Sequence, residues 1–371
     1  MKVLLCGGGT GGHVMPAIAI AEIIEKSFTD TEIAFAGRTG GTENEAYIKT
    51  GHKLYTVDIE GISRSLTIRN AVAVFKAIKS GRIARSVIMD FAPDLIIGTG
   101  GYVCYPFIRQ GQRLKVKTLM HESNVSPGLV TRVLGPKCQR LLLNLEGTKD
   151  HLRKTDNTVI VGNPTRSGFD RITKVEAKRR LGIPQTKTVI VSFGGSLGAG
   201  VLNEAVLGFI KNYVIGSNRI YHIHATGRNY FDDIKKNHDD LFESKKNVKV
   251  IPYIEDMPTV LKAADIAITR SGAMTVSELA ACGTPSILIP SPNVTANHQY
   301  YNAKYMEKRG AAILLEEKEL TFEKLTNEVD RLIRSDYAMH RMSVNARNLA
   351  KADTERLIAK AISEVAGENL G

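Results

Sequence analysis

The chain has 371 residues, of which 43% are apolar and 24% charged, so it is long enough for two folded domains and its composition excludes intrinsic disorder. The net charge of +12 favours anionic partners. Nucleic acid is the weaker choice among them, because the chain has no Trp, only 6% aromatic residues and no basic run with interleaved aromatics.

The four cysteines are scattered and form no C-x-x-C pair, which argues against a zinc site or a disulfide framework. They are Cys6, Cys104, Cys138 and Cys282. We expect buried, reduced thiols in a reducing compartment. The apolar run 3–6 is too short for a signal peptide, and no apolar stretch approaches the roughly 20 residues of a membrane-spanning helix. The expected location is the cytosol or a membrane surface.

Short apolar runs alternate with helical patterns along the whole chain. The first series of predicted strands covers residues 3–6, 32–36, 54–59, 94–97, 116–120, 140–144 and 158–161. The second covers residues 188–193, 220–225, 248–252, 265–269, 286–290 and 311–315. Between the first two strands, residues 17–26 have helical spacing, with Pro16 expected in the first turn. This alternation predicts an α/β protein with two Rossmann-like domains, each a doubly wound parallel sheet.

The predicted domain boundary lies at Gly162–Arg166, after the last strand of the first series. Pro164 favours an extended Asn163, which suits a linker. We therefore expect an N-terminal domain at 1–163, a second domain at 164–345, and a C-terminal helix at 346–371 that packs back on the first. The apolar stripe of that helix is Leu357, Ile358, Ala361, Ile362 and Val365.

Three glycine-rich loops directly follow predicted strands, at 7–12, 98–101 and 194–199. A helix that begins after such a loop offers free N–H groups and the positive end of its dipole to a phosphate. Three loops split between two domains suggest a cleft that handles more than one phosphate group. The first loop also matches the dinucleotide pattern G-x-G-x-x-G, but the second strand ends in Gly37-Arg38, without the acid that holds a ribose. An NADP dehydrogenase stays an alternative, since Arg38 could meet a 2′-phosphate.

Polar side chains follow two strands of the first domain. His13 comes just after the first glycine loop and is a candidate substrate contact or general base, against the alternative of a structural histidine. Residues His121–Asn124 end another strand, where a His–Glu pair could orient a hydroxyl, or where Ser123 and Asn124 could hold a turn.

In the second domain, Arg270-Ser271-Gly272 precedes a predicted helix that ends at Gly283. Glu278 lies one turn beyond Thr275 and could accept both hydroxyls of a ribose, or could simply complement the helix dipole. The chain has no Asp-x-Asp, so a metal-diphosphate site is not indicated and a cation such as Arg166 would meet the leaving phosphate.

Residues 71–91 combine apolar and basic positions. They are Val72, Phe75, Lys76, Ile78, Lys79, Arg82 and Arg85. A basic amphipathic segment indicates a membrane-surface element, although an ordinary packed helix with a wet basic face has the same pattern.

Seven motifs together resemble the MurG family of glycosyltransferases, over essentially the whole chain. They are Gly-Gly-Thr-Gly-Gly-His at 8–13, Gly-Thr-Gly-Gly-Tyr at 98–102, His-Glu-x-Asn at 121–124, Gly-Asn-Pro-x-Arg at 162–166, Gly-Gly-Ser-x-Gly-Ala at 194–199, Arg-Ser-Gly-Ala-x-Thr-x-x-Glu at 270–278 and Asn-His-Gln at 297–299. Ser123 stands where many relatives have Gln, and Met274 where many have Leu; neither change removes a charge or a base. The resemblance implies the GT-B fold, with the two domains facing a deep cleft.

The resemblance also implies an inverting transfer of N-acetylglucosamine from UDP-N-acetylglucosamine to the C4 hydroxyl of the muramoyl sugar of lipid I. We expect no cofactor. The implied donor contacts are Thr10, Gly11, Gly12, Asn124, Arg166, Ser196, Ile254, Ala273, Met274, Thr275, Val276, Ser277, Glu278 and Gln299. The acceptor diphosphate would lie near Gly100, Gly101 and Tyr102. His13 is the first candidate base, followed by Glu122 or His121.

The implied partners are lipid I, the anionic cytoplasmic face of the membrane, and cell-wall or division proteins. The motifs are also compatible with two alternative functions. One is a related GT-B enzyme that glycosylates diacylglycerol, and the other is a UDP-sugar sensor without turnover.

Overall fold

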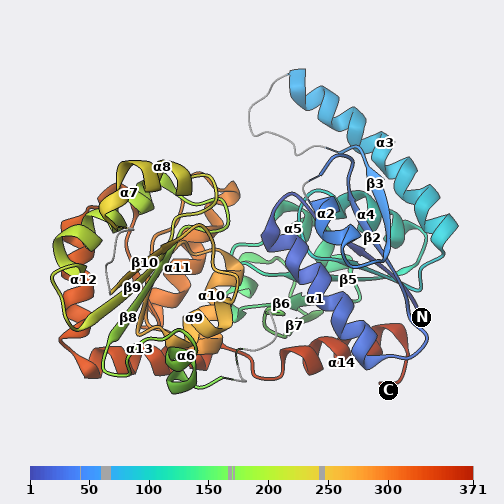
Figure 1. The fold of residues 1–371 in the computed structure, drawn as a ribbon. Coiled ribbons are helices and arrows are strands. Elements are labelled where there is room, and N and C mark those ends of the chain that lie inside the picture. Colours follow the sequence, from blue (N-terminus) through green and yellow to red (C-terminus); the bar gives the residue numbers. More distant parts are fainter. Residues whose placement is uncertain (42, 60–67, 166–168, 170–171, 242–246, 371) are drawn as a thin grey trace. The chain divides into compact units, whose positions relative to one another are not determined.

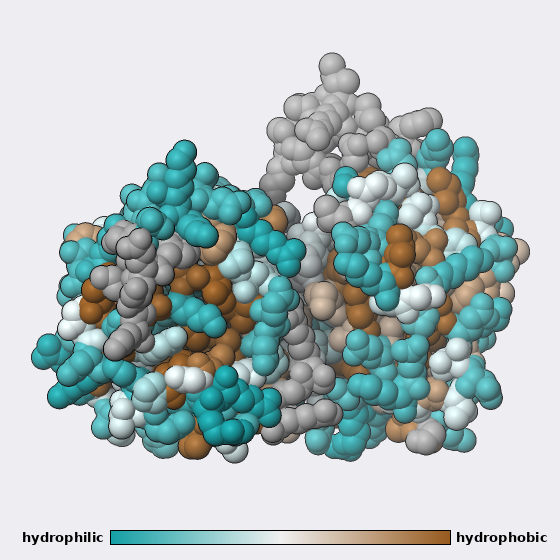
Figure 2. Space-filling view, in the orientation of Figure 1, coloured by the Kyte–Doolittle hydropathy of each residue, from teal (hydrophilic) through white to brown (hydrophobic). Residues whose placement is uncertain are grey.

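The computed structural model describes residues 1–41, 43–59, 68–165, 169, 172–241 and 247–370, without the side chains of 68–78 and 240. The chain forms two units, each with its own sheet and core. The first comprises Met1–Thr165 and Asp353–Gly371, and the second comprises Arg166–Ala352. Hydrophilic side chains cover most of the visible face of each unit (Figure 2).

The first unit has a parallel sheet of seven strands in the order β3-β2-β1-β4-β5-β6-β7 (Figure 1). The strands are β1 (Lys2–Cys6), β2 (Glu32–Arg38), β3 (Lys53–Val57), β4 (Leu95–Gly98), β5 (Lys117–Glu122), β6 (Arg140–Leu143) and β7 (Thr158–Ile160). The helices are α1 (Gly11–Ser27), α2 (Glu43–Ile48), α3 (Ile68–Phe91), α4 (Cys104–Arg113), α5 (Leu129–Leu134) and α14 (Thr354–Ala366), with short 3-10 turns η1 (Gly135–Lys137) and η2 (Glu146–His151).

Both faces of this sheet are buried, because strand residues alternate between two helical layers. Val3 and Leu5 of β1 pack in the core formed with α1, α2 and α14, while Leu4 and Cys6 pack in the core formed with α3 and α4. Figure 1 shows α14, in red, beside α1, in blue. The end of the chain therefore completes the core of the unit in which the chain begins.

The second unit has a parallel sheet of six strands in the order β10-β9-β8-β11-β12-β13. The strands are β8 (Thr188–Phe193), β9 (Ile220–Ala225), β10 (Val248–Ile251), β11 (Ile266–Thr269), β12 (Ser286–Leu288) and β13 (Ile313–Leu314). The helices are α6 (Lys174–Arg180), α7 (Gly200–Phe209), α8 (Phe231–Asn237), α9 (Met257–Ala263), α10 (Ala273–Cys282), α11 (His298–Lys308), α12 (Phe322–Ile333) and α13 (Asp336–Leu349). Short turns are η3 (Ile210–Val214), η4 (Asp239–Leu241), η5 (Thr295–Asn297) and η6 (Glu317–Glu319).

The same alternation builds the second core. Val189 and Val191 of β8 pack with α9, α10 and α11, while Ile190 packs with α7 and α12. The prediction of two doubly wound parallel sheets is confirmed, and each predicted strand is present with bounds that differ by at most a few residues. The four cysteines are buried and form no disulfide, as expected.

Two local expectations were wrong. Helix α1 begins at Gly11, six residues before the predicted start, so Pro16 lies inside the helix and not in its first turn. Gly9 has φ +86° and Thr10 is extended, which turns the chain into the helix early. The C-terminal tail is divided by a break after Leu349, so α14 spans Thr354–Ala366 instead of 346–371. The chain passes from the second unit back to the first at this break.

Candidate active site

Two glycine-rich loops of the first unit meet at the carboxyl ends of β1 and β4, the point where the strand order reverses. Ligands bind at this point in open α/β sheets. Thr99 Oγ1 donates to the carbonyl of His13 at 2.7 Å. A Cβ on Gly100 would lie 2.4 Å from His13 Cδ2, and one on Gly101 would lie 2.2 Å from Gly8 O. Only glycine allows the loops to approach this closely.

The tautomer of His13 follows from its hydrogen bonds. Its Nδ1 lies 3.1 Å from the carbonyl oxygen of Gly8 and 3.2 Å from Thr10 Oγ1. A carbonyl only accepts, so Nδ1 carries a proton, and in the neutral imidazole the lone pair is on Nε2. A general base acting through Nε2 requires this tautomer. Thr10 and Gly11, at the same edge, are exposed.

His121 and Glu122 are turned into the protein instead. His121 is fully buried, its Nε2 lies 3.0 Å from Gly162 O, and burial lowers the pKa of its imidazole below the ordinary value. Glu122 accepts hydrogen bonds from the backbone N–H and side-chain amide of Asn124 and from Gly128 N–H. These contacts fold the loop after β5. Of the three candidate bases, His13 is partly exposed, whereas His121 and Glu122 are buried.

Tyr102 and Asn124 complete this edge of the sheet. A Cβ on Gly9 would lie 3.7 Å from the Tyr102 ring, so Tyr102 lies beside the first loop. Asn124 is half-buried, and its carbonyl accepts from Thr148 Oγ1. The strand ends of β1, β4 and β5 therefore gather the candidate bases and substrate contacts predicted in the first unit. Arg166, a predicted donor contact that begins the second unit, lies outside the described residues.

The second unit has a matching arrangement at β8 and β11, where its own strand order reverses. The loop 194–199 leads into α7, with Ser196 exposed and its carbonyl accepting from Arg228 N–H. Gly272 caps α10 in an extended conformation, so the first N–H groups of α10 are at the same edge as the loop. The predicted residues Ala273, Met274, Thr275, Val276 and Ser277 form the first turns of this helix.

A hydrogen-bonded frame holds the start of α10. Ser271 Oγ donates to Gln299 O at 2.8 Å, Asn302 Nδ2 donates to Ser271 O at 3.1 Å, and Gln299 Oε1 accepts from Ser291 N–H at 2.9 Å. Glu278 is 7% exposed, one turn beyond Thr275. Ile254 is buried in the core with Val276.

Four buried polar residues were not predicted from the sequence. Glu43 and Tyr47 of α2 contact the first glycine loop. His222 and His224 of β9 share the hydroxyl of Ser192, each at 2.7 Å. The two-residue spacing of the histidines was the one available signal, since it places both on the same face of a strand.

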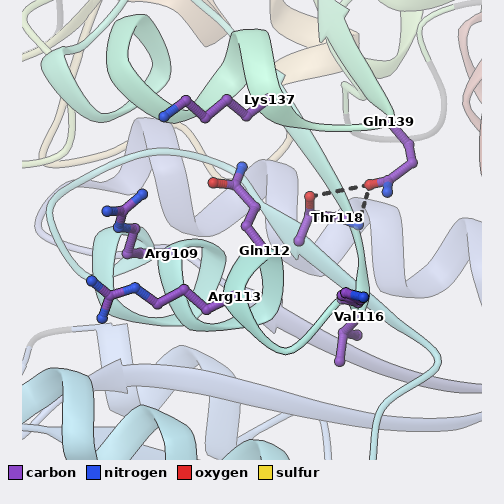
Figure 3. Close-up of a pocket in the computed structure, with 8 residues that line it drawn as sticks. Arg109, Gln112, Arg113, Val116, Thr118, Lys137 and Gln139 are labelled. Carbon is purple, nitrogen blue, oxygen red and sulfur yellow. Dashed lines mark hydrogen bonds between the residues drawn. The ribbon is translucent and has the colours of Figure 1, made fainter.

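A basic pocket of about 430 Å³ lies at the amino end of β5, the opposite edge from the glycine loops (Figure 3). It is lined by Arg109, Gln112, Arg113, Lys115, Val116, Thr118, Lys137 and Gln139. Arg109, Arg113 and Lys137 extend toward the same side of the pocket. No acid lines it.

The predicted membrane residues lie on α3, which packs against α4. Lys79, Arg82 and Arg85 are exposed, while the side chains of Val72, Phe75, Lys76 and Ile78 lie outside the described part. In the described ranges, no helix combines the length and apolarity needed to cross a membrane. Nor do the described His, Cys, Asp and Glu residues form a group of three or more that could hold a metal ion.

Comparison with known proteins gives the same pair of domains. Residues 3–143 match the glycosyltransferase family 28 N-terminal domain, and residues 189–361 match the family 28 C-terminal domain. A relative from Acetivibrio thermocellus is 37% identical over 98% of both chains, and one from Clostridioides difficile is 38% identical over 98% of this chain and 89% of its own. Both are named UDP-N-acetylglucosamine–N-acetylmuramyl-(pentapeptide) pyrophosphoryl-undecaprenol N-acetylglucosamine transferase.

Solved structures agree on the fold. MurG of Acinetobacter baumannii has a TM-score of 0.78 at 24% identity, covering 98% of this chain and 99% of its own. A UDP-GlcNAc 2-epimerase from Neisseria meningitidis, bound to UDP-GlcNAc, has a TM-score of 0.65 at 17% identity, covering 98% of this chain and 100% of its own. On the sequence matches, the chain belongs to glycosyltransferase family 28.

Proposed function

We propose that this protein transfers N-acetylglucosamine from UDP-N-acetylglucosamine to N-acetylmuramyl-(pentapeptide) pyrophosphoryl-undecaprenol, making lipid II for peptidoglycan. The observation that carries the proposal is the 37% identity, over nearly the full length of both chains, to a transferase of this name. In each sheet, glycine-rich loops lie where the strand order reverses. They support the proposal, because the donor and the acceptor each contain a diphosphate.

The second unit is the proposed donor site. Ser196 and its loop would meet the diphosphate, together with the N-terminus of α10, and Glu278 would accept from the ribose hydroxyls. The backbone of Ile254 would contact uracil, and Gln299 the sugar. As UDP leaves, charge develops on its diphosphate, and the fixed N–H groups of the loop and helix stabilise that charge without reorganisation.

The first unit is the proposed acceptor site, with Gly100, Gly101 and Tyr102 near the acceptor diphosphate. His13 Nε2 takes the proton of the C4 hydroxyl while the C4 oxygen attacks the anomeric carbon from the face opposite UDP. The bond from that carbon to the UDP oxygen breaks with its electron pair going to UDP, so the configuration inverts. The proton then passes from His13 to solvent.

The membrane surface is the proposed site of encounter with the lipid acceptor. Exposed Lys79, Arg82 and Arg85 on α3 and the cations of the basic pocket support an anionic partner for the first unit. Each basic residue near an anionic bilayer contributes about 1 kcal/mol. We place the protein peripherally, on the cytoplasmic face.

The test is UDP release with and without a lipid I analogue. Release that requires the analogue and gives a disaccharide product supports the proposal. Transfer to diacylglycerol but not to lipid I would assign a glycolipid synthase, and donor binding without turnover would assign a UDP-sugar sensor.

A further inference from the structure

A buried carboxylate contacts the first glycine loop from inside the protein. Glu43, the first residue of α2, is 3% exposed. Its Oε1 accepts from Arg38 N–H at 2.9 Å, and its Oε2 accepts from Gly9 N–H at 3.5 Å. Among the described residues no cation lies within ion-pair distance of it. Two backbone dipoles are thus the charge-assisted partners that allow this carboxylate to stay buried.

Two glycines next to Glu43 leave the space that its side chain occupies. A Cβ on Gly8 or on Gly41 would lie 2.5 Å from Glu43 Oε1, closer than such atoms approach one another. Gly8 is also the residue whose carbonyl accepts from His13 Nδ1. Glu43 therefore packs against one side of the Gly8 backbone. The carbonyl of Gly8, in turn, orients the His13 imidazole.

Tyr47, one turn further along α2, holds the preceding residue of the loop. Its hydroxyl donates to Gly7 O at 2.9 Å, and its ring stacks on Phe35 with centroids 4.4 Å apart. Burial, the largest cause, raises the pKa of the Tyr47 hydroxyl, so it stays a donor. Helix α2 consequently contacts three successive glycines, Gly7, Gly8 and Gly9.

We propose that Glu43 is a positioning residue, which acts through Gly8 and Gly9 to hold the His13 imidazole in its base tautomer. The inference rests on the proposed role of His13. Glycine loops of this kind usually turn their N–H groups to a bound phosphate. Here the buried carboxylate of Glu43 accepts the hydrogen bond from Gly9 N–H. The loop is therefore preorganised before any substrate arrives, and Glu43 itself does not contact the substrate.

The diagnostic variant is Glu43→Gln. The amide has the same shape and still accepts from Arg38, but its NH2 group faces Gly9 N–H, a donor against a donor. We expect kcat to fall by about tenfold to a hundredfold, because a displacement of a catalytic group by up to about one ångström has an effect of this size. The KM for the UDP-sugar should not change. Glu45→Gln, on the exposed face of the same helix, is the matched control and should behave as wild type.

A double variant tests the route through His13. In a His13→Ala background, Glu43→Gln should lower kcat by less than about twofold, because residues that act as one unit are not additive. The same loss in both backgrounds would overturn the proposal, and so would a wild-type kcat in folded Glu43→Gln. If that variant does not fold, Tyr47→Phe, which keeps the stacked ring and loses the bond to Gly7, should show a smaller loss of kcat with the same non-additivity.

A readout without turnover separates this inference from the proposed function. The 15N shifts of the His13 ring, assigned by comparison with His13→Ala, should report a proton on Nδ1 in the wild type and a mixture of tautomers in Glu43→Gln. If the wild type shows this shift pattern but no transfer to lipid I, the proposed function fails and the positioning role stands. An Nε2–H tautomer in the wild type would overturn the positioning role.

Discussion

At the scale of single residues, His13 and Glu278 carry the chemistry proposed for the two units. His13 lies where loops from β1 and β4 meet, and its hydrogen bond to Gly8 leaves the lone pair on Nε2. Glu278 is a buried residue of α10. Hydrogen bonds among Ser271, Gln299 and Asn302 hold the start of this helix. Both assignments can be tested one side chain at a time.

Replacing His13 by Ala should reduce kcat by roughly 10²–10⁴, the usual contribution of a general base. Donor affinity should change little, since the donor is assigned to the second unit. The measurement is steady-state transfer to a soluble lipid I analogue. If kcat survives and only the KM for the acceptor rises, His13 is a binding residue, and Glu122 becomes the next base to test.

Replacing Glu278 by Ala removes the acceptor of the ribose hydroxyls. Loss of a charge-assisted hydrogen bond of about 1.5–3 kcal/mol corresponds to roughly tenfold to more than a hundredfold weaker binding of the UDP-sugar. Calorimetry on the folded variant measures it, with exposed Glu204→Ala on α7 as the control. Unchanged affinity would remove Glu278 from the donor site.

At the scale of elements, strand β9 carries a buried polar network whose stability depends on pH. Ser192 bridges His222 and His224, both fully buried. Burial lowers the pKa of His224 from its ordinary 6.5 to about 4, and lowers that of His222 well below its ordinary value. Both imidazoles are therefore neutral in the folded unit near neutral pH.

The sign of the pH effect follows from these directions. As pH falls below 6.5 the unfolded chain takes up a proton at His224 that the folded chain does not take up until about pH 4. The free energy of unfolding should thus drop by about 2 kcal/mol between pH 7 and pH 5 from this group alone. Urea unfolding at both pH values measures it. His224→Gln should flatten the dependence, whereas exposed His340→Gln should not.

Helix α3 is the element proposed to meet the membrane. Changing Lys76, Lys79, Arg82 and Arg85 to Gln should strip the protein from anionic vesicles, because each contributes about 1 kcal/mol at low salt. Turnover of a short-chain soluble acceptor should stay nearly intact. Co-sedimentation at low and high salt, with the soluble assay in parallel, measures both. Sedimentation like that of the wild type would assign the contact elsewhere and leave α3 an ordinary packed helix.

At the scale of the whole molecule, residues 353–371 belong to the same unit as residues 1–165. Helix α14 follows the entire second unit in sequence but completes the core of the first. Ile358 and Ile362 are fully buried there, against residues of α1. The complete core of the first unit therefore includes residues of α14.

Replacing Ile362 by Ala tests this dependence. Truncating a buried Ile should lower the free energy of unfolding of the first unit by about 2–5 kcal/mol. Leu370→Ala, at an exposed position near the same end, should have little effect. Urea unfolding monitored by circular dichroism gives the comparison. Equal stability of the two variants would show that α14 adds nothing to the first core.

The sequence by itself determined the strands, their grouping into two parallel sheets and the loops that carry the site. Those features are local: an apolar run, a glycine-rich turn and a helix start are written in consecutive residues. His13 and Glu278 were found for the same reason, since each follows a recognisable loop.

Only the tertiary structure decided which polar groups face a site and which face inward. His121, Glu122 and His13 look equivalent in sequence, yet the fold buries two of them and presents the third. Glu43 and Gly9 are 34 residues apart, and nothing in either segment signals their contact. Such pairings depend on how strands and helices far apart in the chain are brought together, and that information lies in the packing and not in any local pattern.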